Sequence, residues 1–265
     1  NIIDLEAMLI EGKHSAVLIQ ASETSTGSKH DIESISRAIK KVSPDTLLVV
    51  DAITALGVYE VQPEKWGLDA VVTGSQKALM LPPGLAFVWL SDNAWNRTEK
   101  SNCPSYYFNL QIERKSQKKN TTAWTPAISL MMGLKVALSM MQEEGLENIY
   151  KRHARLSKST REAIQSMGLD IFTKDLIAEC LTAVEVPEGI NGKDIPNKMQ
   201  SDCGVTIAGG QGDLSDKIFR IGHLGYVDGD DVLIAVSALE KTLFSLGFKF
   251  DKSAGIAAAQ RSLLG

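Results

Sequence analysis

The chain has 265 residues, of which 44% are hydrophobic and 23% are charged, a balance typical of a globular protein and not of a disordered one. Lysine and arginine total 28 against 32 aspartates and glutamates, so the formal net charge is 28 − 32 = −4. This balance excludes a broad basic surface for general nucleic-acid binding. No apolar run reaches the roughly 18 residues that a spanning helix needs, so no membrane partner is expected.

The cysteines and histidines show no metal-binding pattern. The three cysteines are far apart and include no CxxC pair: Cys103, Cys180 and Cys203. The four histidines are scattered as well. We therefore expect neither a structural metal site nor a disulfide framework, and a reducing, cytoplasmic location fits best.

The first twenty residues do not have the pattern of a signal peptide. Acidic residues interrupt the apolar positions, and no small-residue cleavage site follows them. The segment looks like the last turns of a helix running into a strand, as if the chain opened in the middle of a domain.

The first half of the chain alternates short apolar runs with helical periodicity. Four buried strands are predicted, at Ala16–Gln20, Thr46–Val50, Leu68–Thr73 and Gly84–Leu90. Isoleucines at helical spacing between the first two runs predict a helix there. Strand, helix and strand in this order favour an α/β fold with a parallel sheet.

The second half is predicted to be mainly helical at first and then mixed. Residues 91–125 are polar and irregular, and two long helices follow, from Pro126 to about Glu143 and over Leu146–Met167. Three strands and two helices are predicted beyond them: Leu181–Val186, Lys193–Ser201, Val205–Ala208, Ile218–Ile221 and Asp228–Leu246. We expect a large domain over 1–145 and a smaller α+β domain over 146–265, with no assigned role for residues 252–265.

Polar groups follow three of the predicted strands. They are the turn at 23–27, Asp51, and the pair Gln76 and Lys77. Ligands of parallel α/β sheets bind beyond the carboxyl ends of the strands, so all three are expected at one edge. A lysine amine forms a Schiff base with an aldehyde such as pyridoxal phosphate, and a carboxylate beside the ring nitrogen favours its protonated form. Alone, this pattern also fits a surface lysine and a strand-capping aspartate.

Longer sequence motifs at these positions are more specific. They are ETSTG at 23–27, VVDAITALG at 49–57, GSQKAL at 74–79 followed by PPG at 82–84, and FRIGHLG at 219–225. In this order and spacing they resemble the class V (fold type I) pyridoxal-phosphate aminotransferases, in particular the alanine–glyoxylate and serine–pyruvate group. The resemblance covers nearly the whole chain. It implies a mostly parallel sheet flanked by helices and a smaller C-terminal α+β domain.

The resemblance also implies roles for individual residues at the cofactor. Lys77 would hold the cofactor as a Schiff base and then move the substrate proton. Asp51 would pair with the pyridinium nitrogen, and Ile53 would pack on one face of the ring. Thr24 would meet the ring hydroxyl or the nearby backbone, and Gln76 would lie on the phosphate side.

Three further residues are implied at the substrate and at a subunit boundary. Arg220 would bind the substrate carboxylate, for which a planar guanidinium suits better than an ammonium. Thr122 and Thr125 are the candidates for groups that a neighbouring subunit donates to the phosphate. A homodimer is therefore expected, and a separate chain could supply the N-terminal segment that the family carries before this point.

The implied function is transfer of an amino group from a small amino acid, alanine or serine, to a 2-oxo acid, glyoxylate or pyruvate, by ping-pong kinetics. One alternative is a non-catalytic family relative that serves as a partner subunit. Another is a lyase or cysteine desulfurase of the same fold, although desulfurases usually have a histidine where Gln76 stands. The glycine-rich run at 209–212 is interpreted as a flexible loop near the substrate.

Overall fold

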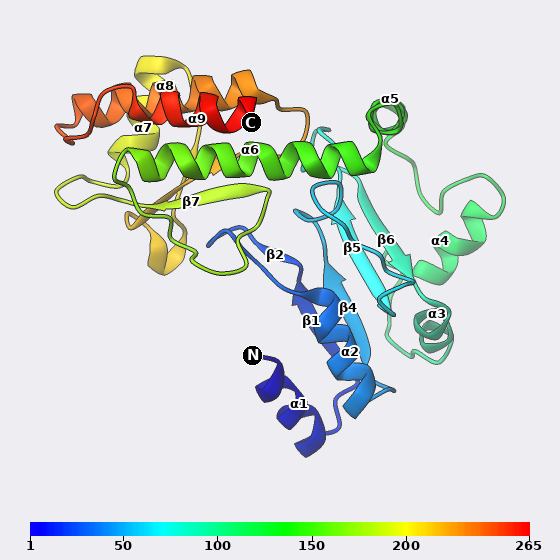
Figure 1. The fold of residues 1–265 in the computed structure, drawn as a ribbon. Helices are drawn as coiled ribbons and strands as arrows, with labels where there is room; N and C mark the ends of the chain where they lie inside the picture. Colours follow the sequence, from blue (N-terminus) through cyan, green and yellow to red (C-terminus); the bar gives the residue numbers. More distant parts are fainter. The chain divides into compact units, whose positions relative to one another are not determined.

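A computed structural model describes residues 1–265, which form two compact units. The first unit comprises residues 1–20, 31–53 and 61–139, and the second comprises residues 21–30, 54–60 and 140–265. Figure 1 shows the elements of both units along the chain. None of the helices combines the length and the apolar character that crossing a bilayer requires.

The first unit is built on a four-stranded sheet in the order β1-β4-β5-β6. The strands are β1 (Ala16–Gln20), β4 (Leu47–Asp51), β5 (Ala70–Gly74) and β6 (Ala86–Leu90). The first three are parallel, as predicted, whereas β6 runs antiparallel to β5. The connection from β5 to β6 is too short for the crossover that a parallel pair needs, so the chain turns back on itself.

Two helices precede and follow β1. They are α1 (Ile2–Glu11) and α2 (Ile32–Val42). The Asp31 carboxylate accepts a hydrogen bond from the Ser34 amide and caps the start of α2. Because Ile32, Ile35 and Ile39 recur at helical spacing, they lie on one face of α2, and all three are buried. Figure 1 shows α2 lying alongside the sheet.

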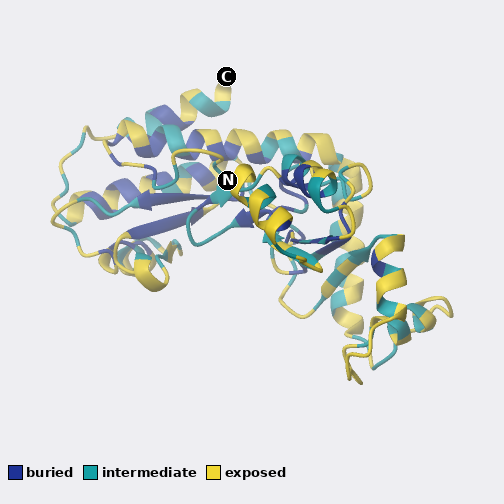
Figure 2. Cartoon of the chain, turned by 90° about the horizontal axis from the view of Figure 1, so that it is seen from below, coloured by how far each residue is buried: buried dark blue, intermediate teal, exposed yellow.

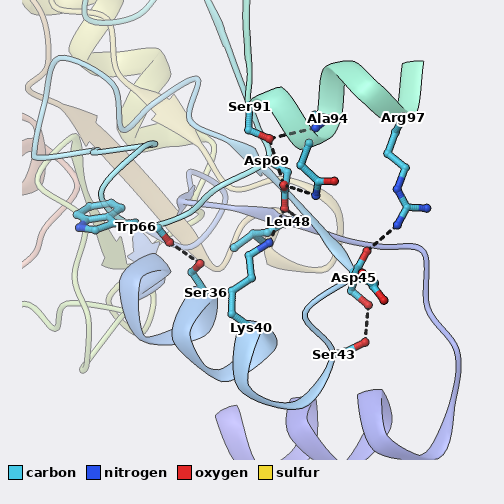
Figure 3. A network of polar contacts seen from close by, with 12 residues as sticks. Ser36, Lys40, Ser43, Asp45, Leu48, Trp66, Asp69, Ser91, Ala94 and Arg97 are labelled. Atoms are coloured by element: carbon cyan, nitrogen blue, oxygen red, sulfur yellow. Dashed lines mark hydrogen bonds and ion pairs between the residues drawn. The ribbon is translucent and has the colours of Figure 1, made fainter. Parts of the chain in front are cut away.

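The side chain of Asp69, just before β5, forms hydrogen bonds with residues of α2, of β4 and of the segment that follows β6 (Figure 3). Its side chain is almost fully buried. Oδ2 accepts from Lys40 Nζ and from the Leu48 amide, each at 2.9 Å, and Oδ1 accepts from Ser91 Oγ at 3.2 Å and Asn93 Nδ2 at 3.1 Å. Burial alone would raise the pKa of this carboxyl, but the donors outweigh burial and the pKa is lowered.

Substituting Asp69→Ala is expected to lower the free energy of unfolding by about 2–4 kcal/mol, because it leaves buried donors without an acceptor. Urea unfolding at pH 7 measures this effect. The pKa of Asp69 is lower in the folded state than in the unfolded state. Its contribution to stability is therefore complete at pH values above the ordinary aspartate pKa and is lost as the pH falls through the pKa of the folded state. The exposed Asp45, substituted as Asp45→Asn, is the control and should change stability little. A similar small change for Asp69→Ala would show that the network does not stabilise the fold.

The stretch 91–125, predicted to be irregular, contains two short helices. They are α3 (Asp92–Glu99) and α4 (Leu110–Gln117). Both are polar and have eight residues, so no long apolar periodicity marks them. Their start signals are local, since the Ser91 and Asn109 side chains cap the first amides of α3 and α4. The prediction was wrong here because it relied on periodicity rather than on caps.

Helix α5 (Ile128–Glu144) contains no buried residue, although it is rich in apolar side chains. Its exposed large apolar residues are Ile128, Met131, Met132, Val136, Leu138 and Met140. On the sheet, Leu18 of β1 and Val88 of β6 are exposed as well. Since sheets with parallel strands usually have both faces covered, apolar surface of this unit remains uncovered in the chain described.

The second unit contains a three-stranded antiparallel sheet in the order β7-β9-β8. Its strands are β7 (Leu181–Glu185), β8 (Ala208–Gly209) and β9 (Ile218–Gly222). Its helices are α6 (Leu146–Ser166), α7 (Asp194–Cys203), the 3-10 helix η1 (Gly212–Leu214), α8 (Gly229–Ser245) and α9 (Ala254–Leu264). Most of the predicted elements are present near the predicted positions, but the strand expected at Val205–Ala208 is reduced to the two residues of β8, and residues 204–207 have no regular structure. Figure 2 shows buried residues concentrated in strands and on the inner sides of helices.

The C-terminal segment, for which the sequence predicted no role, forms α9 and packs in the second unit. Ala258 and Ala259 are buried, and Ser159 Oγ of α6 donates to the carbonyl of Ala259 at 3.1 Å. The Glu240 carboxylate of α8 accepts the Gly255 amide at 2.8 Å. Helix α9 therefore contributes to the core of this unit.

Candidate active site

The turn that carries Lys77 follows β5 and is closed by Ser75. The Ser75 amide donates to the Leu85 carbonyl at 3.1 Å, and its hydroxyl donates to the Pro82 carbonyl at 2.8 Å. Met80, whose amide donates to the Lys77 carbonyl at 2.9 Å, has a left-handed φ of 55°. A non-glycine residue in this region costs of order 1 kcal/mol, so the surrounding bonds hold the turn in one strained conformation.

Asp51 ends β4, and Lys77 follows the end of the neighbouring parallel strand β5. Asp51 is the last residue of β4 and pairs with Val72 of β5, two residues before the end of that strand. Its Oδ1 accepts the Ile53 amide at 2.9 Å, and its other carboxylate oxygen has no partner. Lys77 is partly exposed, and its amine forms no ion pair. Both residues therefore lie at the carboxyl edge of the sheet with groups available for a ligand.

The side chains of Gln76 and Ile53 both lie next to the Cα of Gly74, the last residue of β5. A Cβ added at Gly74 would lie 2.7 Å from Gln76 Oε1 and 3.3 Å from Ile53 Cδ1. A side chain at position 74 would displace both groups, so the glycine allows them to pack against the end of the strand. Sequence reasoning did not single out Gly74, although a glycine at a strand end beside two candidate residues is a recognisable signal.

In the second unit, Arg220 of β9 is held by backbone carbonyls. Its Nε donates to the Gly209 carbonyl at 3.0 Å and Nη1 donates to the Thr24 carbonyl at 2.8 Å. The residue is 9% exposed and forms no ion pair. Burial lowers the pKa of Arg220, and Glu23 opposes this shift. A guanidinium has five N–H donors, so donors remain for a carboxylate ligand.

The turn at 23–27, expected at the sheet edge, is part of the second unit. It connects the short strands β2 (Ser22–Glu23) and β3 (Ser28–Lys29). The Gly27 amide donates to the Glu23 carbonyl at 2.8 Å, and Gly27 has a φ of 79°. Its carbonyl accepts the Ala178 amide at 2.8 Å. Arg220 thus contacts the backbone carbonyl of Thr24, and the side chain of Thr24 forms no hydrogen bond.

Thr122 and Thr125 lie in the loop before α5, apart from the other candidates of the first unit. Thr122 Oγ1 donates to the Trp124 carbonyl at 2.5 Å, and Thr125 is exposed. The Trp124 ring stacks on Tyr107, with ring centroids 4.9 Å apart. Neighbouring Phe108 is 88% exposed. The structure therefore joins these threonines to an aromatic cluster and to none of Asp51, Gln76 and Lys77.

Comparison with known proteins identifies the family. The family described as aminotransferase class-V matches residues 2–215. The chain belongs to this family. A solved structure of ureidoglycine–glyoxylate aminotransferase from Bacillus subtilis superimposes with a TM-score of 0.93 at 28% identity, covering all of this chain and 69% of that one. The predicted fold type I architecture is confirmed.

Among curated relatives, a serine–glyoxylate aminotransferase from Arabidopsis thaliana is 36% identical over 94% of this chain. A protein named as the small subunit of a soluble hydrogenase, from Synechococcus sp. (strain PCC 6716), is 45% identical, also over 94% of the chain. The chain spans 63% and 65% of the lengths of these two relatives.

Proposed function

We propose that the protein is a pyridoxal-phosphate-dependent aminotransferase of small amino acids. One observation carries the proposal: Lys77, which forms no ion pair, and Asp51, which has one carboxylate oxygen without a partner, lie at the carboxyl ends of the neighbouring parallel strands β5 and β4. A scaffold has no physical need for this pair, whereas a cofactor with an aldehyde and a basic ring nitrogen uses both groups. The family supports the assignment.

Residues of the first unit fit the proposed cofactor. The free oxygen of Asp51 suits a protonated ring nitrogen, and the Ile53 side chain beside Gly74 offers an apolar surface for one ring face. Gln76 would reach the phosphate side. When bound, pyridoxal phosphate supplies an aldehyde for the Lys77 amine and withdraws electrons from the substrate α-carbon.

The remaining chemistry is done by side chains of this chain. In the first half-reaction Lys77 Nζ would move the proton from the α-carbon of the amino donor to the cofactor, and in the second it would move a proton from the cofactor to the α-carbon of the acceptor. Arg220 binds the α-carboxylate through the donors that Gly209 and Thr24 leave free. The Thr24 hydroxyl would meet the ring hydroxyl of the cofactor. An amino donor and a 2-oxo acid acceptor thus use one carboxylate site in turn, which is ping-pong kinetics.

We infer a homodimer from the uncovered apolar surface of the first unit. Helix α5 buries no residue, and the aromatic cluster that includes Tyr107 and Phe108 is exposed. Thr122 and Thr125 lie between these two segments in the sequence and would donate to the phosphate of a second copy. Light scattering of the natural full-length protein should give twice the chain mass. A reducing, cytoplasmic location is also proposed, since all three cysteines are free.

A partner subunit without chemistry of its own is the second candidate. It is favoured by two relatives, 45% and 44% identical, that are named as subunits of soluble hydrogenases. A lyase of the same fold would use the same lysine, but it would need no 2-oxo acid acceptor.

Steady-state assays of the natural full-length protein, supplied with pyridoxal phosphate, separate these functions. Alanine, serine and aspartate are each tested against glyoxylate and pyruvate. We expect amino transfer from alanine or serine that requires an acceptor. Turnover without acceptor would indicate a lyase, and no turnover with any pair would favour the partner subunit.

A further inference from the structure

Two consecutive residues of α6 bind the turn that follows β9. Arg152 Nη1 donates to the carbonyls of Gly225 and Val227, both at 2.8 Å. The Gly225 amide donates to His153 Nε2 at 3.0 Å. Both backbone groups of Gly225 are therefore held by α6, and its φ of 94° makes glycine the residue suited to this turn.

Glu144, the last residue of α5, fixes the other side of the Arg152 guanidinium. Its two carboxylate oxygens bind Arg152 Nε at 2.6 Å and Nη2 at 2.9 Å. The pair is partly buried, with side-chain exposures of 18% for Arg152 and 33% for Glu144. Hydrogen bonds from Arg152 lower the pKa of Glu144. A lysine could not make this two-point contact and also reach two carbonyls.

His153 contributes as a neutral acceptor. It is 1% exposed, and Nδ1 lies 2.9 Å from the Ile149 carbonyl, so Nδ1 carries the proton and Nε2 is free to accept. Burial, reinforced by the charge of Arg152, lowers the pKa of His153 to about 4. The tautomer that accepts the Gly225 amide therefore persists at neutral pH.

The turn lies close in sequence to Arg220. Between them, the His223 amide donates to the Cys180 carbonyl at 3.1 Å, and His223 Nε2 lies 2.9 Å from Thr182 Oγ1. Arg220 itself has only carbonyl acceptors from other segments and no ion pair. The position of the Arg220 guanidinium therefore depends on the position of β9. The contacts that hold the two ends of β9 in place determine that position.

We propose that Glu144, Arg152 and His153, which we call the Gly225 clamp, hold the end of β9 and thereby position Arg220 for the substrate carboxylate. These are positioning residues, since none of them is proposed to touch the substrate. The inference rests on the proposed role of Arg220. A displacement of about 1 Å at a binding group can cost as much as 100-fold, so a loosened β9 should be visible in substrate affinity.

The test is Arg152→Lys in the natural full-length protein, read by amide hydrogen exchange and by kinetics. Exchange of the Gly225 amide should rise about 10-fold, and exchange in the β9 peptide that contains Arg220 should rise about 3-fold. KM for the amino donor and for the 2-oxo acid should both rise about 10-fold, with kcat changed by less than about 2-fold. Arg155→Lys, at an exposed position on the same helix, is the matched control and should change neither readout.

A second variant covers the case in which Arg152→Lys does not fold. Glu144→Gln keeps the hydrogen bonds from Arg152 to the carbonyls but removes the ion pair. We therefore expect amide exchange in the β9 peptide and KM for both substrates to rise about 3-fold. Unchanged exchange in the β9 peptide, or faster exchange with unchanged KM, would overturn the proposal. Absence of transamination in the unsubstituted protein would count against the proposed function instead, and exchange in the β9 peptide would still test the clamp.

Discussion

Lys77→Ala is expected to lower kcat for transamination by about 10⁴-fold or more, because it removes both the covalent attachment and the proton-transferring amine. The fold should be retained. Lys77 is partly exposed and forms no ion pair, so the free energy of unfolding should change by no more than about 0.5 kcal/mol. Single-turnover and steady-state rates of the full-length variant measure the first effect, and urea unfolding measures the second.

The matched control for Lys77→Ala is Lys65→Ala, an exposed lysine of the same unit. It should leave both rate and stability unchanged. Substantial turnover in Lys77→Ala would show that another group performs the proton transfer. A large loss of stability would show that the lysine has a structural role.

The second large effect is expected for Arg220→Lys, which should raise KM for amino acids and 2-oxo acids by about 10- to 100-fold. An ammonium can still carry the charge, but it cannot hold the Gly209 and Thr24 carbonyls and also offer a planar fork to a carboxylate. Affinity for pyridoxal phosphate should change by less than about 2-fold, since the proposed cofactor contacts lie on other residues. Equal losses of substrate and cofactor affinity would argue against a carboxylate-binding role.

The elements that the sequence predicted best are those with a local apolar pattern. The apolar runs that became β1, β4 and β5 could be identified directly, as could the helical spacing of α2, although β1, expected to be buried, contains no buried residue. Asp51 and Lys77 followed from their places after such runs. The shape of the Lys77 turn did not, because it depends on the Ser75 hydroxyl and on the left-handed conformation of Met80.

Contacts between distant segments could not be predicted from local patterns. The turn at 23–27 belongs to the second unit through bonds such as that between Gly27 and Ala178. The hydrogen bond from Arg220 to the Thr24 carbonyl joins residues 196 positions apart. The packing of α9 likewise depends on tertiary structure, which neither periodicity nor motif spacing specifies.

Borohydride reduction of the full-length protein loaded with pyridoxal phosphate, followed by mass spectrometry of its peptides, tests the role of Lys77 most directly. We expect reduction to bleach the yellow absorbance and to leave a phosphopyridoxyl group on the peptide that contains Lys77 and on no other. A label on a different lysine, or no label at saturating cofactor, would contradict the proposed active site.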